Sequence, residues 1–171
     1  QDGIARYALE FLIHCASRTG EVLHATWSEF DLKKGLWTIP KERMKAGIEH
    51  RVPLSNRALG ILKLVQPFSN TTHVFPGGKK DKPLSNMAMS MLLRRMGYDS
   101  ITVHGFRSTF RNWAGEQTNY PFEVCEQALA HRLPDAVAAA YLRSDFFERR
   151  SSLLADWSAY CQSKCQTSAV D

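Results

Sequence analysis

Apolar residues recur at helical spacing along most of the chain. In the first segment Ile4, Ala8 and Leu12 follow one another every four residues, and Leu9 and Ile13 fall on the same face. Thr19 is placed to cap a second short helix, and Ser55 to start a later one. The pattern predicts helices over residues 4–15 and 19–25, from Ser55 onward, and over about 84–96, 105–117, 121–130, 134–143 and 146–161.

One part of the N-terminal third departs from the helical pattern. The β-rich run Leu36-Trp37-Thr38-Ile39 stops at Pro40, and a second run, Arg51-Val52-Pro53-Leu54, follows a turn around Ala46 and Gly47. Two such runs joined by a glycine-containing turn are typical of an antiparallel hairpin, with its tip here near residues 45–48. The expected fold is therefore mainly α-helical with a small antiparallel β-sheet.

The chain length suits one domain. It has 171 residues, enough for one sizeable core but hardly for two. We expect this domain to span residues 1–161, and residues 162–171, which lack an apolar stripe, to form a flexible tail. No apolar run approaches the length of about 18 residues that a membrane span needs, and the first residues do not resemble a signal peptide. The absence of an initiator Met suggests a piece of a longer protein, which we expect to be cytoplasmic.

Charge and cysteine content narrow the function classes. The formal net charge is +5, which suits an anionic partner such as nucleic acid without proving one. Cys161 and Cys165 lie one helical turn apart and could form a metal or redox pair, whereas Cys15 and Cys125 have no such neighbour. No Cys-x-x-Cys pair or zinc-spaced histidine is present, so unpaired thiols in a reducing compartment are the favoured interpretation. We expect no cofactor and no metal.

Groups suited to phosphate chemistry occur at four places. Taken singly, each has an ordinary explanation: an arginine can pair with a nearby glutamate, a turn lysine is usually solvated, and a tyrosine after three alanines is usually a core residue. Their order along the chain is more informative than any one of them. In sequence they are Arg18, Lys45, His104 with Arg107, and finally His131 with Tyr141.

This ordered set resembles the tyrosine recombinases, especially the phage and genomic-island integrases. The resemblance rests on an R-x-x-E segment (Arg18 to Glu21), a hairpin lysine (Lys45) before a Val-Pro-Leu strand, and H-x-x-R (His104 to Arg107). It continues with Leu-Ala-His at His131 and with Tyr141, and it covers about residues 4–161. The segment Trp-Ser-Glu-Phe-Asp and the ending Tyr-Leu-Arg-Ser-Asp-Phe-Phe-Glu-Arg-Arg are also similar to that subgroup.

The chain departs from the family pattern in a few positions. His-Cys-Ala-Ser precedes Arg18 where Leu-Thr-Gly is more usual, and Leu-Ala-His replaces the commoner Leu-Gly-His. The spacing from His131 to Tyr141 is one residue longer than in many recombinases. Lys41 competes with Lys45 as the hairpin lysine. A second tyrosine, Tyr160, lies too far along the chain and is expected to pack or to face solvent.

The resemblance implies a reaction at a DNA phosphodiester. Two guanidinium groups, from Arg18 and Arg107, would hold the non-bridging oxygens. A phenol needs help to lose its proton, and His104 is the candidate base for Tyr141, the nucleophile. Lys45 would protonate the leaving 5′-oxygen, and His131 would hydrogen-bond the phosphate. The reaction needs no metal.

The implied partner is double-stranded DNA at attachment sites, with a homotetramer expected for the full-length protein. Candidate phosphate contacts are Lys79, Lys80, Lys82, Arg94, Arg95 and Arg132, although each could equally be solvated. Residues 146–171 could dock on a neighbouring subunit or pack within the chain through Leu153 and Trp157. The alternatives are a type IB topoisomerase-like relaxase, a catalytically inactive DNA-binding remnant, and a purely structural helical protein.

Overall fold

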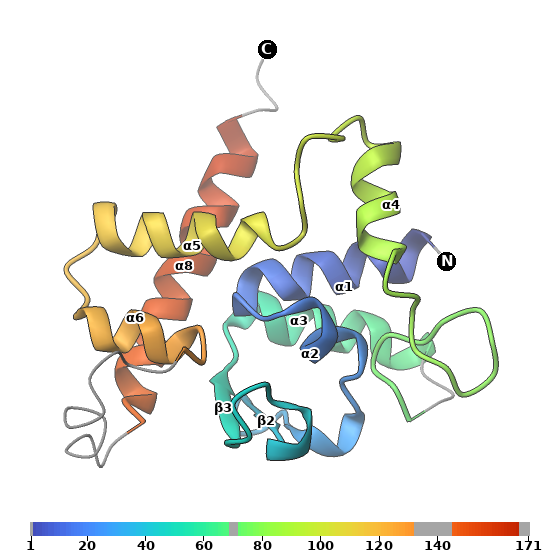
Figure 1. The fold of residues 1–171 in the computed structure, drawn as a ribbon, viewed down its shortest axis with the longest axis horizontal. Coiled ribbons are helices and arrows are strands. Elements are labelled where there is room, and N and C mark those ends of the chain that lie inside the picture. The colour runs from blue at the N-terminus through green and yellow to red at the C-terminus, as the bar shows by residue number, and fades with distance from the viewer. Residues whose placement is uncertain (1, 69–71, 132–144, 168–171) are drawn as a thin grey trace.

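The structure is a computed structural model that describes residues 2–68, 72–131 and 145–167. The expected mainly helical fold with a small antiparallel sheet is confirmed (Figure 1). Short 3₁₀ helices lie at Trp27–Glu29, Lys41–Arg43 and Gln66–Phe68. The helices are α1 (Asp2–Cys15), α2 (Thr19–Leu23), α3 (Asn56–Val65), α4 (Ala88–Arg95), α5 (Gly105–Gln117), α6 (Phe122–Ala128) and α8 (Phe147–Thr167), and the strands are β1 (Phe30–Asp31), β2 (Leu36–Ile39) and β3 (His50–Pro53).

The predicted hairpin forms the larger part of the sheet. Strands β2 and β3 are antiparallel, with Trp37 opposite Val52 and Ile39 opposite His50. The sequence did not predict β1, which pairs with the other edge of β2 and completes the order β1-β2-β3. A strand of two residues is too short to show an alternating pattern. Its Phe30 ring instead stacks on Trp37, with ring centroids 5.4 Å apart, and this contact holds it on the sheet.

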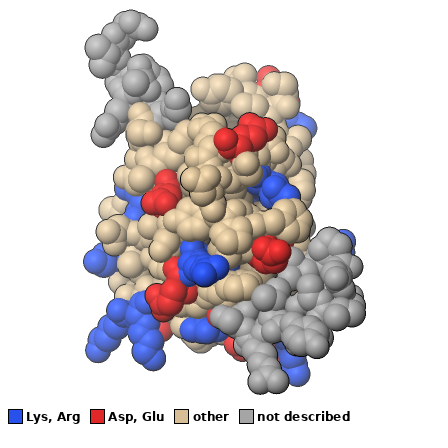
Figure 2. Space-filling view, turned by 90° about the vertical axis from the view of Figure 1, so that its left-hand side faces the viewer, with Lys and Arg blue, Asp and Glu red and all other residues tan. Residues whose placement is uncertain are grey.

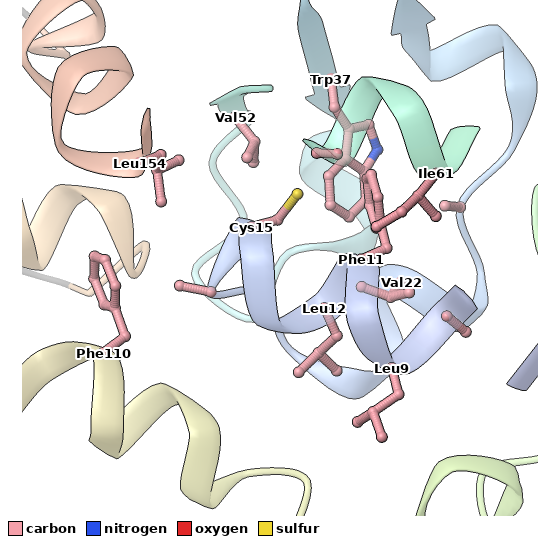
Figure 3. Close-up of a cluster of buried hydrophobic side chains, with 14 of the residues drawn as sticks. Leu9, Phe11, Leu12, Cys15, Val22, Trp37, Val52, Ile61, Phe110 and Leu154 are labelled. Atoms are coloured by element: carbon pink, nitrogen blue, oxygen red, sulfur yellow. The ribbon is translucent and has the colours of Figure 1, made fainter. Parts of the chain in front are cut away.

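Helix α1 lies at the centre of the molecule and contacts α2, α3, α4 and α8. Its Phe11 is fully buried and lies 5.5 Å from the Trp37 ring and 5.6 Å from the Phe75 ring, measured between centroids (Figure 3). The predicted start of α3 is also confirmed, because the Ser55 hydroxyl accepts from the Ala58 backbone N–H at 3.3 Å. The helices and the sheet thus share one hydrophobic core.

A second part of that core joins α8 to α5 and α1. Leu153 and Trp157 are buried, and the Trp157 indole N–H donates to the Ile13 carbonyl at 2.7 Å. The Trp157 ring also lies 5.1 Å from Trp113, and Tyr160 stacks on Trp157. The intramolecular packing of α8 is therefore confirmed, and Tyr160 is a packing residue.

Several predicted helix boundaries differ from the structure. Helix α4 begins at Ala88 rather than near residue 84, because Leu84 donates its N–H to Phe75 and Pro76 forms a bridge with Pro83. Helix α6 is shorter than predicted, ending at Ala128. Helix α8 continues past residue 161 to Thr167 and so extends into the segment 162–171 that was expected to form a tail. The division into a domain and a flexible tail stays a prediction. The predicted helix at 134–143 lies outside the described residues.

None of the helices in the described part of the chain is long and apolar enough to cross a bilayer.

Candidate active site

The turn after α1 brings Arg18 to the start of α2. Ser17 donates its N–H to Leu12 and Ala16 donates to Ile13, at 3.2 and 3.1 Å. This is the Schellman arrangement, and it requires the residue after the helix end, here Ala16, to take a positive φ of 48°. The prediction that Thr19 caps α2 was wrong. Arg18 is the capping residue, because the Glu21 carboxylate reaches back and accepts the Arg18 backbone N–H at 2.8 Å.

The Arg18 guanidinium is held on two sides but stays partly exposed. Its Nη1 donates to Glu21 Oε1 at 2.8 Å, and its Nη2 lies 3.4 Å from the Ala130 carbonyl. The Arg18 side chain is 28% exposed, whereas that of Glu21 is 6% exposed. The sequence-based possibility that Arg18 pairs with Glu21 is thus correct, and this pairing leaves the outer edge of the guanidinium accessible to an anion.

Arg107, on the first turn of α5, is the most enclosed of the candidate residues that the structure describes. It is 5% exposed, and its guanidinium donates to the backbone carbonyls of Ala16 and Leu129. Burial, followed by the nearby charge of Arg18, lowers the pKa of Arg107 to about 10, so the group remains charged at neutral pH. Arg107 therefore ties the end of α1 to the end of α6.

His131 is the last residue of a second Schellman turn, at the end of α6. Here His131 donates its backbone N–H to Glu126 at 3.0 Å, and Ala130 takes a φ of 50°. The His131 ring has a partner on each nitrogen: Nδ1 lies 2.9 Å from Glu126 Oε2, and Nε2 lies 3.3 Å from Arg107 Nη2. The Arg111 Nε contacts the other carboxylate oxygen of Glu126.

Two adjoining cavities meet at His131. One, of about 460 Å³, is lined by the hairpin tip, by the residue before α2 and by the turn after α6. Lys41 is not among its lining residues. The other, of about 210 Å³, lies along α5. The first is lined by Arg18, Lys45, Ala46, Ala130 and His131, and the second by His104, Arg107, Ser108, Arg111, Asn112, Leu129 and His131.

The structure thus brings five of the six predicted site residues to one place. Arg18, Lys45 and Arg107 supply positive charge, and His104 and His131 supply imidazole groups, around a cleft open to solvent. The position of Lys45 on this cleft favours it over Lys41 as the hairpin lysine. Tyr141 lies outside the described residues. Such a set of donors suits a phosphate group, and the described residues contain no cluster of ligands that could hold a metal ion.

Sequence reasoning missed two residues of the site, Glu126 and Arg111. Glu126 stands five positions before His131, which is the spacing that a Schellman turn brings together at a helix end. That spacing could have revealed the pair. However, the turn normally has glycine where this chain has Ala130, so nothing in the residue types indicated a Schellman turn there.

Comparison with known proteins identifies the family of this chain. The profile of the phage integrase family matches residues 2–148. Prophage integrase IntA of Escherichia coli (strain K12) is 36% identical over 144 residues, which cover 82% of this chain and 35% of IntA. The chain therefore spans about a third of the length of that relative.

Two solved structures of lambda integrase share the fold. The dimer bound to a COC′ core site matches with a TM-score of 0.58 and 20% identity, over 84% of this chain and 43% of that one. The tetramer bound to a Holliday junction matches with a TM-score of 0.57 and 19% identity, over 83% of this chain and 42% of that one. Taken together, the profile, the relative and the shared fold show that the chain belongs to the phage integrase family of tyrosine recombinases.

Proposed function

We propose that residues 1–161 form the catalytic domain of a site-specific recombinase that cleaves and rejoins double-stranded DNA through Tyr141. The observation that carries this proposal is the convergence of Arg18, Lys45 and His131 on one solvent-open cleft, with Arg107 lining the adjoining cavity and contacting His131. These four side chains come from segments far apart in the sequence. If each of these side chains only formed an ion pair or packed in the core, the four would have no reason to lie together.

The two arginines are arranged to hold the phosphate. Attack at phosphorus places additional negative charge on the non-bridging oxygens, and guanidinium groups already fixed in place stabilise that charge without reorganising. Arg107 is fixed by backbone carbonyls and Arg18 by Glu21. Removing one such donor typically lowers the rate by about 10²–10³-fold.

Tyr141 supplies the nucleophile in the proposed reaction. Its phenolic oxygen forms a bond to phosphorus while the bond to the 5′-oxygen breaks, which leaves a 3′-phosphotyrosine and a free 5′-hydroxyl. His104, at the start of α5, takes the phenolic proton, and Lys45 gives a proton to the leaving oxygen. Rejoining reverses these steps with a 5′-hydroxyl from another strand, and the phosphodiester energy is kept throughout.

The proposed partners follow from the chemistry and from the relatives. Lambda integrase has been solved as a dimer on a core site and as a tetramer on a Holliday junction. We propose that the full-length protein likewise acts on DNA attachment sites as a tetramer, and that it integrates or excises a prophage or genomic island. Relatives named as prophage integrases favour this outcome over relaxation by a lone topoisomerase-like enzyme.

Covalent trapping on a nicked suicide substrate carrying the attachment site of the element tests the proposal in the full-length protein. We expect wild type to form a denaturation-resistant protein–DNA band and Tyr141→Phe to form none. Tyr160→Phe is the matched control, because Tyr160 packs on Trp157 and Trp113 and should keep the band. DNA binding without any band would instead indicate an inactive remnant, and a band that Tyr141→Phe retains would assign the nucleophile elsewhere.

A further inference from the structure

We infer that Glu126 is a positioning residue for His131: its carboxylate fixes the proton on Nδ1, so that the Nε2 lone pair accepts from Arg107 beside the phosphate cleft. The contact between the Glu126 carboxylate and the His131 ring is seen directly in the structure. Its consequence for DNA cleavage rests on the proposed function.

The backbone turn at the end of α6 builds the pair locally. A Schellman turn places the second residue after the helix end over the residue five positions earlier, and two apolar side chains commonly meet there. In this chain the two positions hold His131 and Glu126, whose backbones are joined by a 3.0 Å hydrogen bond. The side chains then meet at 2.9 Å, between Nδ1 and Oε2. The two paired residues thus lie within six consecutive residues of the chain.

The partners of the ring assign its tautomer. An ionised carboxylate can only accept a hydrogen bond, and a guanidinium can only donate one. Nδ1 faces Glu126 and must carry the proton, whereas Nε2 faces Arg107 Nη2 at 3.3 Å and must offer its lone pair. The opposite tautomer would satisfy neither partner. Two independent neighbours therefore select the same form of His131.

Arg111 in turn holds Glu126. Its Nε contacts Glu126 Oε1, and its guanidinium carbon lies 4.9 Å from the centroid of the Phe122 ring. The Glu126 side chain is 12% exposed. One of its carboxylate oxygens contacts Arg111 and the other contacts His131. His131 is 41% exposed and would be free to turn without this support. The other charged or titratable groups around the same cleft are Arg18, Lys45, His104 and Arg107.

The tautomer of the His131 ring can be measured, and it would not change if Glu126 had only a structural role. Long-range ¹H–¹⁵N NMR spectra of ¹⁵N-histidine-labelled protein, with the signal assigned through His131→Asn, show which ring nitrogen is protonated. We expect the Nδ1–H form in wild type and in Glu123→Gln, an exposed control on the same helix. Glu126→Ala should lower the population of the Nδ1–H form, because only Arg107 then selects it. An Nε2–H ring in wild type would overturn the inference.

A double-mutant cycle in the full-length protein tests the consequence for cleavage. Glu126→Ala should slow formation of the covalent intermediate by about 10–100-fold. This is the loss typical of removing the carboxylate that hydrogen-bonds a metal-binding histidine, and the carboxylate here orients His131 in the same way. On a His131→Ala background Glu126→Ala should have no further effect. Glu126→Gln should lie in between, because its amide keeps one accepting oxygen but places an NH₂ group, which can only donate, against Arg111 or His131.

The outcomes separate the two proposals. An effect of Glu126→Ala that persists in full on the His131→Ala background would overturn the positioning role. A wild-type protein that never forms the intermediate would contradict the proposed function, while the tautomer measurement would still decide the role of Glu126.

Discussion

At the scale of the residue, Ala16 and Ala130 carry backbone strain beside the candidate arginines. Both take the left-handed conformation at the end of a Schellman turn, where Gly97 fills the same position after α4. For a residue with a Cβ this conformation costs about 1–2 kcal/mol. The carbonyl of Ala16 accepts from Arg107, and that of Ala130 from Arg18. Each strained turn thus supplies one carbonyl partner to one of the two guanidinium groups.

Ala16→Gly and Ala130→Gly should therefore each raise the free energy of unfolding by about 1 kcal/mol, because glycine adopts a positive φ without the Cβ clash. The matching rise in Tm is about 2–4 °C for a domain of this size, measured by thermal or urea denaturation. Ala8→Gly, inside α1, is the opposite control and should lower stability by about 1 kcal/mol or more. A drop in stability for the two turn variants would contradict the role assigned to these turns.

At the scale of the element, strand β3 packs against α8 through two buried ionisable side chains. His50 is 9% exposed, and Arg150 on α8 is 1% exposed. Arg150 donates to the carbonyl of Arg51, and its Nη2 lies 3.0 Å from the Asp145 carboxylate. Burial, followed by the charge of Arg150, lowers the pKa of His50 to about 4. The strand therefore requires a neutral imidazole at this position.

This requirement predicts a loss of stability in acid. In the unfolded chain His50 takes up a proton near pH 6.5, whereas in the folded chain it does so only near pH 4. The free energy of unfolding should fall as pH drops through that interval, by about 3 kcal/mol from this residue. Denaturant titrations at several pH values should show a shallower fall for His50→Gln. The exposed variant His24→Gln should keep the wild-type slope, and equal slopes for all three proteins would exclude His50 as the cause.

At the scale of the whole molecule, the net charge of +5 raises the question of where the basic side chains lie on the surface. On the face drawn in Figure 2, basic and acidic side chains are interspersed rather than separated. Three of the basic residues that the sequence marked as candidate DNA contacts, Lys79, Lys82 and Arg95, line one groove of about 580 Å³ beside the start of α4. A groove whose charged lining residues are all cations is suited to a phosphate backbone.

Replacing Lys79 and Lys82 together by Gln should weaken DNA binding about equally for all sequences, because phosphate contacts carry no base information. The slope of log K against log salt should become shallower by about 1 for each lysine–phosphate interaction that the substitutions remove. Fluorescence anisotropy across a salt series measures both effects. The charge-matched control, Lys33→Gln with Lys63→Gln, removes two exposed lysines outside the groove. An unchanged slope in the groove variant would exclude the groove from the DNA interface.

Much of the fold was predictable because its patterns are local. Helical spacing in α1 and α5, the cap at Ser55 and the turn at Gly47 each depend on a few neighbouring residues, and all were found. The ordered arginine, lysine, histidine and tyrosine motif was sufficient to indicate the family, since each member is readable as a residue type at a given place in the chain.

The sequence by itself determined the hairpin, the family, the candidate residues and the existence of the helices in the described part of the chain, although not their exact ends. Only the tertiary structure decided how those residues are held. Arg107 reaches a carbonyl 91 positions away, and its burial follows from that contact rather than from its neighbours. The left-handed alanines and the pairing of Glu126 with His131 were likewise hidden. These features depend on backbone geometry and on segments that the core brings together. Residue types and their spacing alone do not reveal either of these.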